Sequence, residues 1–177
     1  AYRNKYWRVK RLWKEMEEAA IQAVIQHPQE WVGLGKVVWE TRGDFLFCTL
    51  PSGRDLAYPF PQVREKKTPW GEMRPQLTFM GINPKNKQWQ RQHTYGGSLV
   101  ENVVQAIARD LMAEATLRLE QGGRYAPILT VHDEILAEAK TGVGDIKEFI
   151  ALMAQCPTWA SDCPVSAEGW KGTRYRK

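Results

Sequence analysis

Apolar residues near the start of the chain recur every three to four positions. Val9, Trp13, Met16 and Ala20 form this stripe. The spacing predicts a single helix over residues 2–27. No Ser, Thr, Asp or Asn caps the start of this helix, and the first residue is not Met. We therefore expect the chain to be part of a longer polypeptide.

Short apolar runs separated by turn residues follow the first helix. Strands are expected at 37–39 and 45–48, joined by a turn at Arg42-Gly43-Asp44. Residues 59–75 are rich in Pro and Lys, which predicts a loop. A second turn at Pro51-Ser52-Gly53-Arg54 is followed by Leu56-Ala57-Tyr58, and two more short strands are expected at 77–80 and around Trp89.

The second half of the chain predicts a long helix, two strands and a short helix. The long helix should span residues 99–121, because Gly122-Gly123 provides a stop signal. Asp145 suits the N-cap of a helix over 146–155, and Glu148 stands where it would complete a capping box. A last short strand is expected at 165–168.

Two faces of the long helix differ in character. Val103, Ile107 and Leu111 share an apolar side, and Asn102, Gln105 and Arg109 share a polar side. Amide and guanidinium groups side by side can bind base edges and phosphates, although an ordinary solvent-exposed face would look the same. Asp110 lies near the apolar side and is expected to be a buried structural acid.

Two adjacent acids, Asp133 and Glu134, lie between two apolar stretches of the second half of the chain. The apolar stretches on either side of His132-Asp133-Glu134 are expected to form strands, so the acids should lie in a tight turn between them. A pair of carboxylates at such a turn suits a hard divalent cation, because Mg²⁺ binds one or two carboxylates together with substrate phosphates.

Charge and cysteine content narrow the class of protein. The net charge is +5, and the excess of Lys and Arg lies in the first hundred residues. Basic stretches interleaved with Trp and Tyr suit a phosphate backbone, but they also suit a solvated helix face. The three cysteines lack zinc-type spacing and indicate reduced thiols in the cytoplasm. No apolar run of about 18 residues predicts a membrane span.

Several segments, taken in order, resemble the C-terminal part of a family A DNA polymerase of the phage or prophage type. The segments are Pro51-Ser52-Gly53-Arg54, Thr94-Tyr95-Gly96-Gly97, residues 101–110 and Val131-His132-Asp133-Glu134. The first helix resembles the segment that leaves the fingers helix of that family. The resemblance covers essentially the whole chain.

The resemblance implies particular roles. Asp133 would be the palm aspartate that ligates both catalytic Mg²⁺ ions, with Glu134 as a less directly coordinating neighbour. His132 and Gln105 would contact the primer terminus and the template. From the helix face we add Asn102 and Arg109 as DNA contacts. Arg54 would grip the phosphate backbone or bond carbonyls in its own turn, and we favour the second reading.

The resemblance also implies a fold and a division of the chain. We expect an α/β (α+β) fold in which a small antiparallel palm sheet, with the Val-His-Asp-Glu hairpin at its centre, packs against long helices. The leading helix would occupy residues 1–28, hairpins and a basic loop region 29–98, and the palm core 99–177.

The expected function is DNA-directed DNA polymerisation in DNA replication, with primer-template DNA and a deoxynucleoside triphosphate as substrates. A second metal-binding Asp and a nucleotide-binding fingers helix were not found in the sequence. We therefore expect this piece to be inactive without the missing N-terminal portion, and to self-associate through exposed apolar surface. The alternatives are a non-catalytic DNA-binding relic and an unrelated metal-dependent nuclease.

Overall fold

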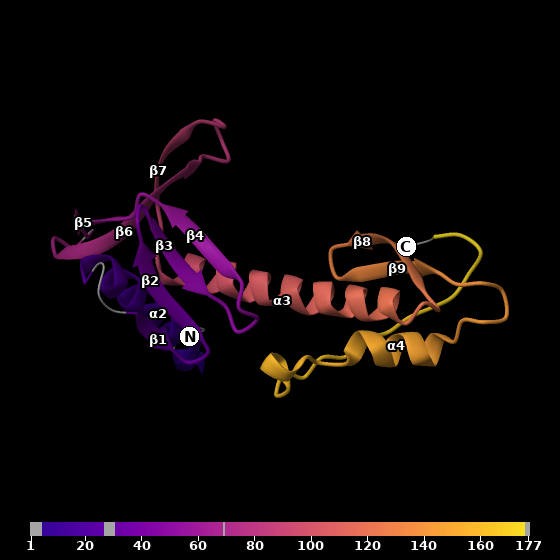
Figure 1. The fold of residues 1–177 in the computed structure, drawn as a ribbon. Coiled ribbons are helices and arrows are strands. Elements are labelled where there is room, and N and C mark those ends of the chain that lie inside the picture. Colours follow the sequence, from indigo (N-terminus) through magenta and orange to yellow (C-terminus); the bar gives the residue numbers. More distant parts are fainter. Residues whose placement is uncertain (1–4, 27–30, 69, 176–177) are drawn as a thin grey trace. The chain divides into compact units, whose positions relative to one another are not determined.

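The computed structural model describes residues 5–26, 31–68 and 70–175 (Figure 1). The chain divides into two compact units, Ala1–Ala106 and Ile107–Lys177, and each is described by itself. Helices combine with antiparallel strands, which confirms the expected mixed α and β fold. None of the helices in the described ranges is long and apolar enough to cross a membrane. The three cysteines are free.

The first unit is built around helix α2 (Trp7–Ile25). This helix confirms the predicted one, whose outermost residues, 2–4 and 27, lie outside the described residues. Its buried residues are Met16, Ala19, Ala20, Ile21 and Ala23. These residues form the apolar stripe of the amphipathic pattern, and the helix contacts strands of both sheets of the unit.

A four-stranded antiparallel sheet contains β1 (Val32–Leu34), β2 (Val37–Arg42), β3 (Phe45–Thr49) and β4 (Asp55–Pro59), in that order. Arg42 pairs with Phe45, so the predicted turn is a two-residue hairpin in which Gly43 has a φ of +56°. Trp39 is fully buried, and its indole nitrogen lies 3.3 Å from the sulfur of Met16. This contact joins the sheet to α2.

A second antiparallel sheet contains β5 (Gln62–Lys67), β6 (Met73–Ile82) and β7 (Trp89–His93). The predicted loop over 59–75 was therefore wrong, because most of this segment forms β5 and the start of β6. Most side chains of β5 are exposed, so the strand shows no apolar alternation. Backbone pairing with β6 forms the strand without that pattern. The rings of Tyr58 and Phe79 pack edge to face, with their centroids 5.1 Å apart, and link the two sheets.

Helix α3 (Gly96–Gln121) confirms the predicted long helix and begins three residues earlier than expected. Its first residue lies against the backbone of α2. A Cβ atom added to Gly96 would stand 1.8 Å from the carbonyl oxygen of Trp13. Only glycine permits this approach of the two helices.

The second unit contains the remainder of α3, the hairpin of β8 (Ala126–Val131) and β9 (Glu134–Glu138), α4 (Ile146–Ala154) and a 3₁₀ turn, Thr158–Ala160. Its core consists of Ala115, Leu119, Tyr125 and Ile135. The predicted strands around His132-Asp133-Glu134 are confirmed. Within the described ranges this hairpin forms a two-stranded sheet of its own rather than the centre of a wider one.

Two local predictions for the second unit were wrong. Residues 165–168 form no strand, because their backbone pairs with no other strand in the described part of the chain. Asp145 caps α4 as predicted, accepting a hydrogen bond from the backbone N–H of Lys147. Glu148 does not complete a capping box, because its carboxylate binds Tyr125 and Arg124, and the N–H of Asp145 donates to the Tyr125 hydroxyl instead.

Candidate nucleic-acid and metal site

The acidic turn lies at the tip of the β8–β9 hairpin. Val131 pairs with Glu134, which leaves His132 and Asp133 as the two turn residues. Both are exposed. His132 has a φ of +53°, in the left-handed region that few residues other than glycine adopt, although His is among those enriched there. Residues held in such conformations cluster at functional sites.

The two carboxylates of the turn have different surroundings. Glu134 is half-buried, and its Oε2 accepts a hydrogen bond of 2.9 Å from the hydroxyl of Tyr175. Asp133 makes no hydrogen bond or ion pair within the described ranges. The Asp133 carboxylate is therefore the one available to a cation or a solvent molecule.

The contact between Tyr175 and Glu134 was missed in the sequence. The two residues are 41 positions apart, and no periodicity connects a C-terminal tail to a hairpin. Tyr175 stands in the basic tail Arg174-Tyr175-Arg176-Lys177, whose composition favours an exposed segment. The contact raises the pKa of Tyr175, chiefly because the hydrogen bond to Glu134 favours the protonated phenol.

The polar residues predicted on α3 are all exposed. They are Asn102, Gln105 and Arg109. The side-chain amide of Asn102 donates a hydrogen bond of 3.1 Å to the hydroxyl of Tyr58, so part of its bonding capacity is used inside the first unit. Gln105 and Arg109 make no hydrogen bond or ion pair with other described residues. Asp110 is buried, as expected for a structural acid.

Arg54 contacts α3 next to Gln105. It lies in the turn between β3 and β4, and its guanidinium donates a hydrogen bond of 2.9 Å to the carbonyl oxygen of Ala106. The backbone N–H of Arg54 also contacts the hydroxyl of Ser52, 3.4 Å away. The guanidinium thus bonds a backbone carbonyl, and that carbonyl belongs to a helix residue 52 positions later in the chain.

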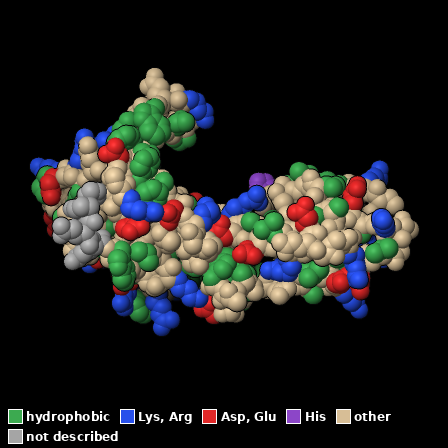
Figure 2. Space-filling view, in the orientation of Figure 1, with side chains coloured by type: hydrophobic (Ala, Val, Ile, Leu, Met, Phe, Trp, Pro, Cys, Tyr) green, Lys and Arg blue, Asp and Glu red, His purple; other side chains and the backbone are tan. Residues whose placement is uncertain are grey.

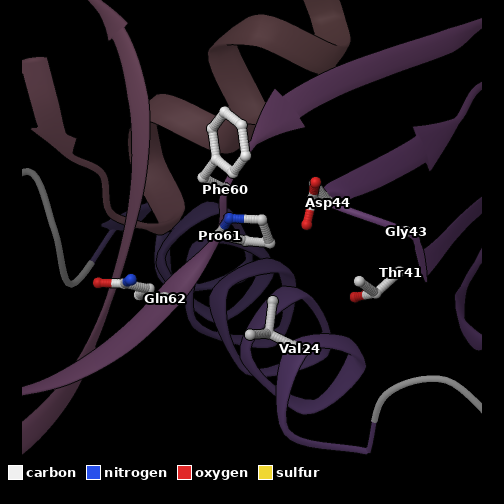
Figure 3. Close-up of a pocket in the computed structure, with 7 residues that line it drawn as sticks. All are labelled: Val24, Thr41, Gly43, Asp44, Phe60, Pro61 and Gln62. Atoms are coloured by element: carbon white, nitrogen blue, oxygen red, sulfur yellow. The ribbon is translucent and has the colours of Figure 1, made fainter.

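A shallow pocket of about 290 Å³ lies elsewhere in the first unit (Figure 3). It is lined by Val24, Thr41, Gly43, Asp44, Phe60, Pro61 and Gln62. None of the predicted site residues lines this pocket. Asp44 is the one carboxylate among these residues, so the lining offers neither an acid–base pair nor a set of metal ligands.

These features define a mixed α and β protein with an exposed His-Asp turn at a hairpin tip and a polar helix face. Over all of its 177 residues the chain is 36% identical to a DNA polymerase of Bacillus phage SP02. The predicted resemblance to a phage DNA polymerase is thereby confirmed. The chain spans 26% of the length of that relative. No protein-family profile and no solved structure matches the chain.

Proposed function

We propose that this chain forms part of a template-directed DNA polymerase of family A and that Asp133 is a ligand of its catalytic Mg²⁺ ions. The observation that carries the proposal is the exposed Asp133 at the tip of a tight hairpin, in a chain that is similar along its whole length to part of a phage DNA polymerase. The proposed reaction joins a deoxynucleoside triphosphate to a primer 3′-hydroxyl and releases pyrophosphate.

The residues of the hairpin fit one part of a metal site. The Asp133 carboxylate is exposed, and Mg²⁺ binds through one or two protein carboxylates, water and substrate phosphates. No group of three metal-ligating side chains occurs among the described residues. The described residues therefore supply an incomplete set of ligands, and we assign the further carboxylate to another part of the polymerase. When bound, the ions would stabilise the charge that develops on the attacking and leaving oxygens.

Glu134 has a separate role in this proposal. Its Oε2 accepts the hydrogen bond from Tyr175, which fixes one oxygen of the carboxylate beside Asp133. This arrangement keeps Glu134 oriented and leaves Asp133 as the principal ligand. His132, in the same turn, is exposed and would contact the primer terminus.

The polar face of α3 would hold DNA. Gln105 and Arg109 are exposed and have their donors available, so we assign them to the template and to phosphates. Arg54 would position this face rather than bind DNA itself, because its guanidinium is bonded to the helix carbonyl of Ala106. The side-chain amide of Asn102 donates one hydrogen bond to Tyr58, and its remaining donor and its acceptor would contact DNA.

The proposed function is tested by primer extension with Mg²⁺ and all four nucleotides. The chain is assayed alone and mixed with a separately produced N-terminal portion of the polymerase. We expect extension only in the mixture and its loss in Asp133→Asn. Glu138→Gln is the matched control, because Glu138 is an exposed acid at the other end of β9, and it should retain extension.

Two other outcomes would change the assignment. Extension by the chain alone would overturn the proposal that a further metal-binding carboxylate comes from another part of the polymerase. DNA binding without extension, even in the mixture, would favour a non-catalytic DNA-binding protein. A nuclease is the weaker candidate, because Glu138 pairs with Ala126 at the end of the hairpin opposite the acidic turn and cannot share a metal with Asp133.

A further inference from the structure

The β6–β7 hairpin carries an uncovered apolar pair at its end. Ile82 and Trp89 are cross-strand partners at the last paired position. Ile82 is 64% exposed and Trp89 is 55% exposed. The hairpin projects from the first unit (Figure 1), and hydrophobic side chains lie along this projection with Lys or Arg at its end (Figure 2). Exposed apolar side chains that adjoin one another and are rimmed by polar residues are typical of an interaction site.

The turn that follows this pair has a defined conformation. The backbone N–H groups of Asn83 and Lys87 bond to the carbonyl oxygens of Gln88 and Asn83 at 2.9 and 2.8 Å. The side chains of Asn83 and Asn86 accept hydrogen bonds from the N–H groups of Lys85 and Gln88 at 2.8 and 3.1 Å. The turn is therefore built by its own side chains, and both lysines are exposed on it.

The charge of the hairpin is entirely positive. Residues 73–100 contain no Asp or Glu, and Lys85 and Lys87 form no ion pair within the described ranges. The opposite end of the same sheet differs, because Glu72 pairs with Arg74 there at 2.7 Å. An exposed indole flanked by unpaired cations is complementary to an anionic polymer with flat aromatic groups, which describes a nucleic acid strand.

We propose that the tip of the β6–β7 hairpin is a binding site for single-stranded DNA. Trp89 stacks on an unpaired base, Ile82 supports the indole from the neighbouring strand, and Lys85 and Lys87 contact the phosphates of the same strand. A duplex presents a free base face only at its ends, so the stacking favours a single strand. The inference relies on the proposed function only for the identity of the polymer as DNA.

The stacking is tested by fluorescence anisotropy of a labelled oligothymidine with the full chain in EDTA. Trp89→Leu keeps the apolar pairing with Ile82 and removes the indole. We expect it to weaken binding by roughly 5- to 150-fold, the range for loss of one base–aromatic stack. Trp89→Phe should recover most of the affinity. Trp70→Leu is the matched control, since Trp70 is 78% exposed at the opposite end of the sheet. Unchanged binding by Trp89→Leu, or an equal loss in Trp70→Leu, would overturn the proposal.

The phosphate contacts are tested by the dependence of binding on salt. Lys85→Gln with Lys87→Gln should lower the slope of log K against log salt by about 1.4, which corresponds to two phosphates of a single strand. Lys66→Gln with Lys67→Gln removes the same charge from β5 and should change the slope little. An equal change in both pairs would indicate general attraction and would contradict a site at the tip.

Two further measurements distinguish single-strand binding at the hairpin tip from the proposed polymerase activity. Asp133→Asn should bind the oligothymidine as the unmodified chain does, because the assay contains no metal. Binding that depends on Trp89 would therefore stand even if primer extension failed. On a blunt duplex of the same length Trp89→Leu should have a much smaller effect, and an equal effect there would overturn the preference for a single strand.

Discussion

The hydroxyl of Tyr175 donates a hydrogen bond of 2.9 Å to Oε2 of Glu134 and so joins the C-terminal tail to the acidic turn. The bond occupies one oxygen of the acid beside Asp133. The tail therefore belongs to the surroundings of the proposed metal ligand, although its sequence resembles an ordinary basic terminus.

This hydrogen bond should be visible in the titration of Tyr175. The bond to Glu134 raises the pKa of Tyr175 above its ordinary value of 10.0. The bond is therefore fully present below the ordinary value and is lost as the pH rises through the raised pKa. Glu134→Gln should return the pKa of Tyr175 towards 10.0, because the acceptor loses its charge. Ultraviolet difference titration, with Tyr175→Phe to assign the signal, would contradict the contact if the pKa did not move.

Glu148 should contribute to the acid sensitivity of the second unit. Hydrogen bonds from Tyr125 and Arg124, at 2.7 and 2.5 Å, lower the pKa of Glu148 below its ordinary value of 4.5. The resulting stability is present above that value and is lost as the pH falls through the lowered pKa. Thermal unfolding from neutral pH to about pH 3 should show a smaller fall in Tm for Glu148→Gln than for the unmodified chain.

Glu138→Gln is the control for this experiment, because Glu138 is exposed on β9. It should retain the acid sensitivity of the unmodified chain. If Glu148→Gln lost Tm as steeply on acidification as this control, the carboxylate would not be stabilised in the way described.

Gly96 and Gly97 should respond differently to alanine. At Gly96 the new Cβ would meet the backbone carbonyl of Trp13 at 1.8 Å, so the helices must separate. We expect Gly96→Ala to lower the free energy of unfolding by about 1–3 kcal/mol or more. At Gly97 the nearest atom, 2.6 Å away, belongs to the exposed ring of Tyr95, which can rotate aside. Gly97→Ala should change stability by less than about 1 kcal/mol. Equal losses in urea unfolding would contradict the close approach of α2 and α3.

Asn102 and Gln105 should separate structural from DNA-binding roles on α3. Tyr58 is buried, and burial raises the pKa of its hydroxyl to about 12. Asn102→Ala removes the hydrogen bond to this hydroxyl and should lower the free energy of unfolding by about 0.5–1.5 kcal/mol. Gln105→Ala should change stability by less than about 0.5 kcal/mol and weaken binding to primer-template DNA. Stability is measured by urea unfolding and binding by anisotropy. Unchanged DNA binding by Gln105→Ala would remove Gln105 from the proposed interface.

Elements with strong periodicity could be predicted from the sequence. Helix α2 follows its apolar stripe, and the hairpin around Gly43 follows its turn residue. Strand β5 could not be predicted, because its polar residues lie on an exposed strand that backbone pairing with β6 maintains. The predicted strand at 165–168 failed for the opposite reason, since no partner strand is available to it in the described ranges.

In the candidate site, too, local pattern predicts some features and fails to predict others. The turn at His132-Asp133 could be predicted, because apolar strands on both sides leave the polar residues at the tip. The contacts of Glu134 with Tyr175 and of Arg54 with Ala106 could not be predicted, because they join residues 41 and 52 positions apart. Tertiary packing rather than local pattern decides such contacts.

Asp133 as a metal ligand is tested by a change of metal preference in Asp133→Cys, within the mixture of this chain and the N-terminal portion. A thiolate binds soft metals better than Mg²⁺. If Asp133 is a metal ligand, Asp133→Cys should lose primer extension with Mg²⁺ and regain part of it with Mn²⁺ or Cd²⁺, while Glu138→Cys should extend normally with Mg²⁺. Normal extension by Asp133→Cys with Mg²⁺, or the same loss in every metal from a variant that circular dichroism shows to be folded, would show that Asp133 is not a metal ligand.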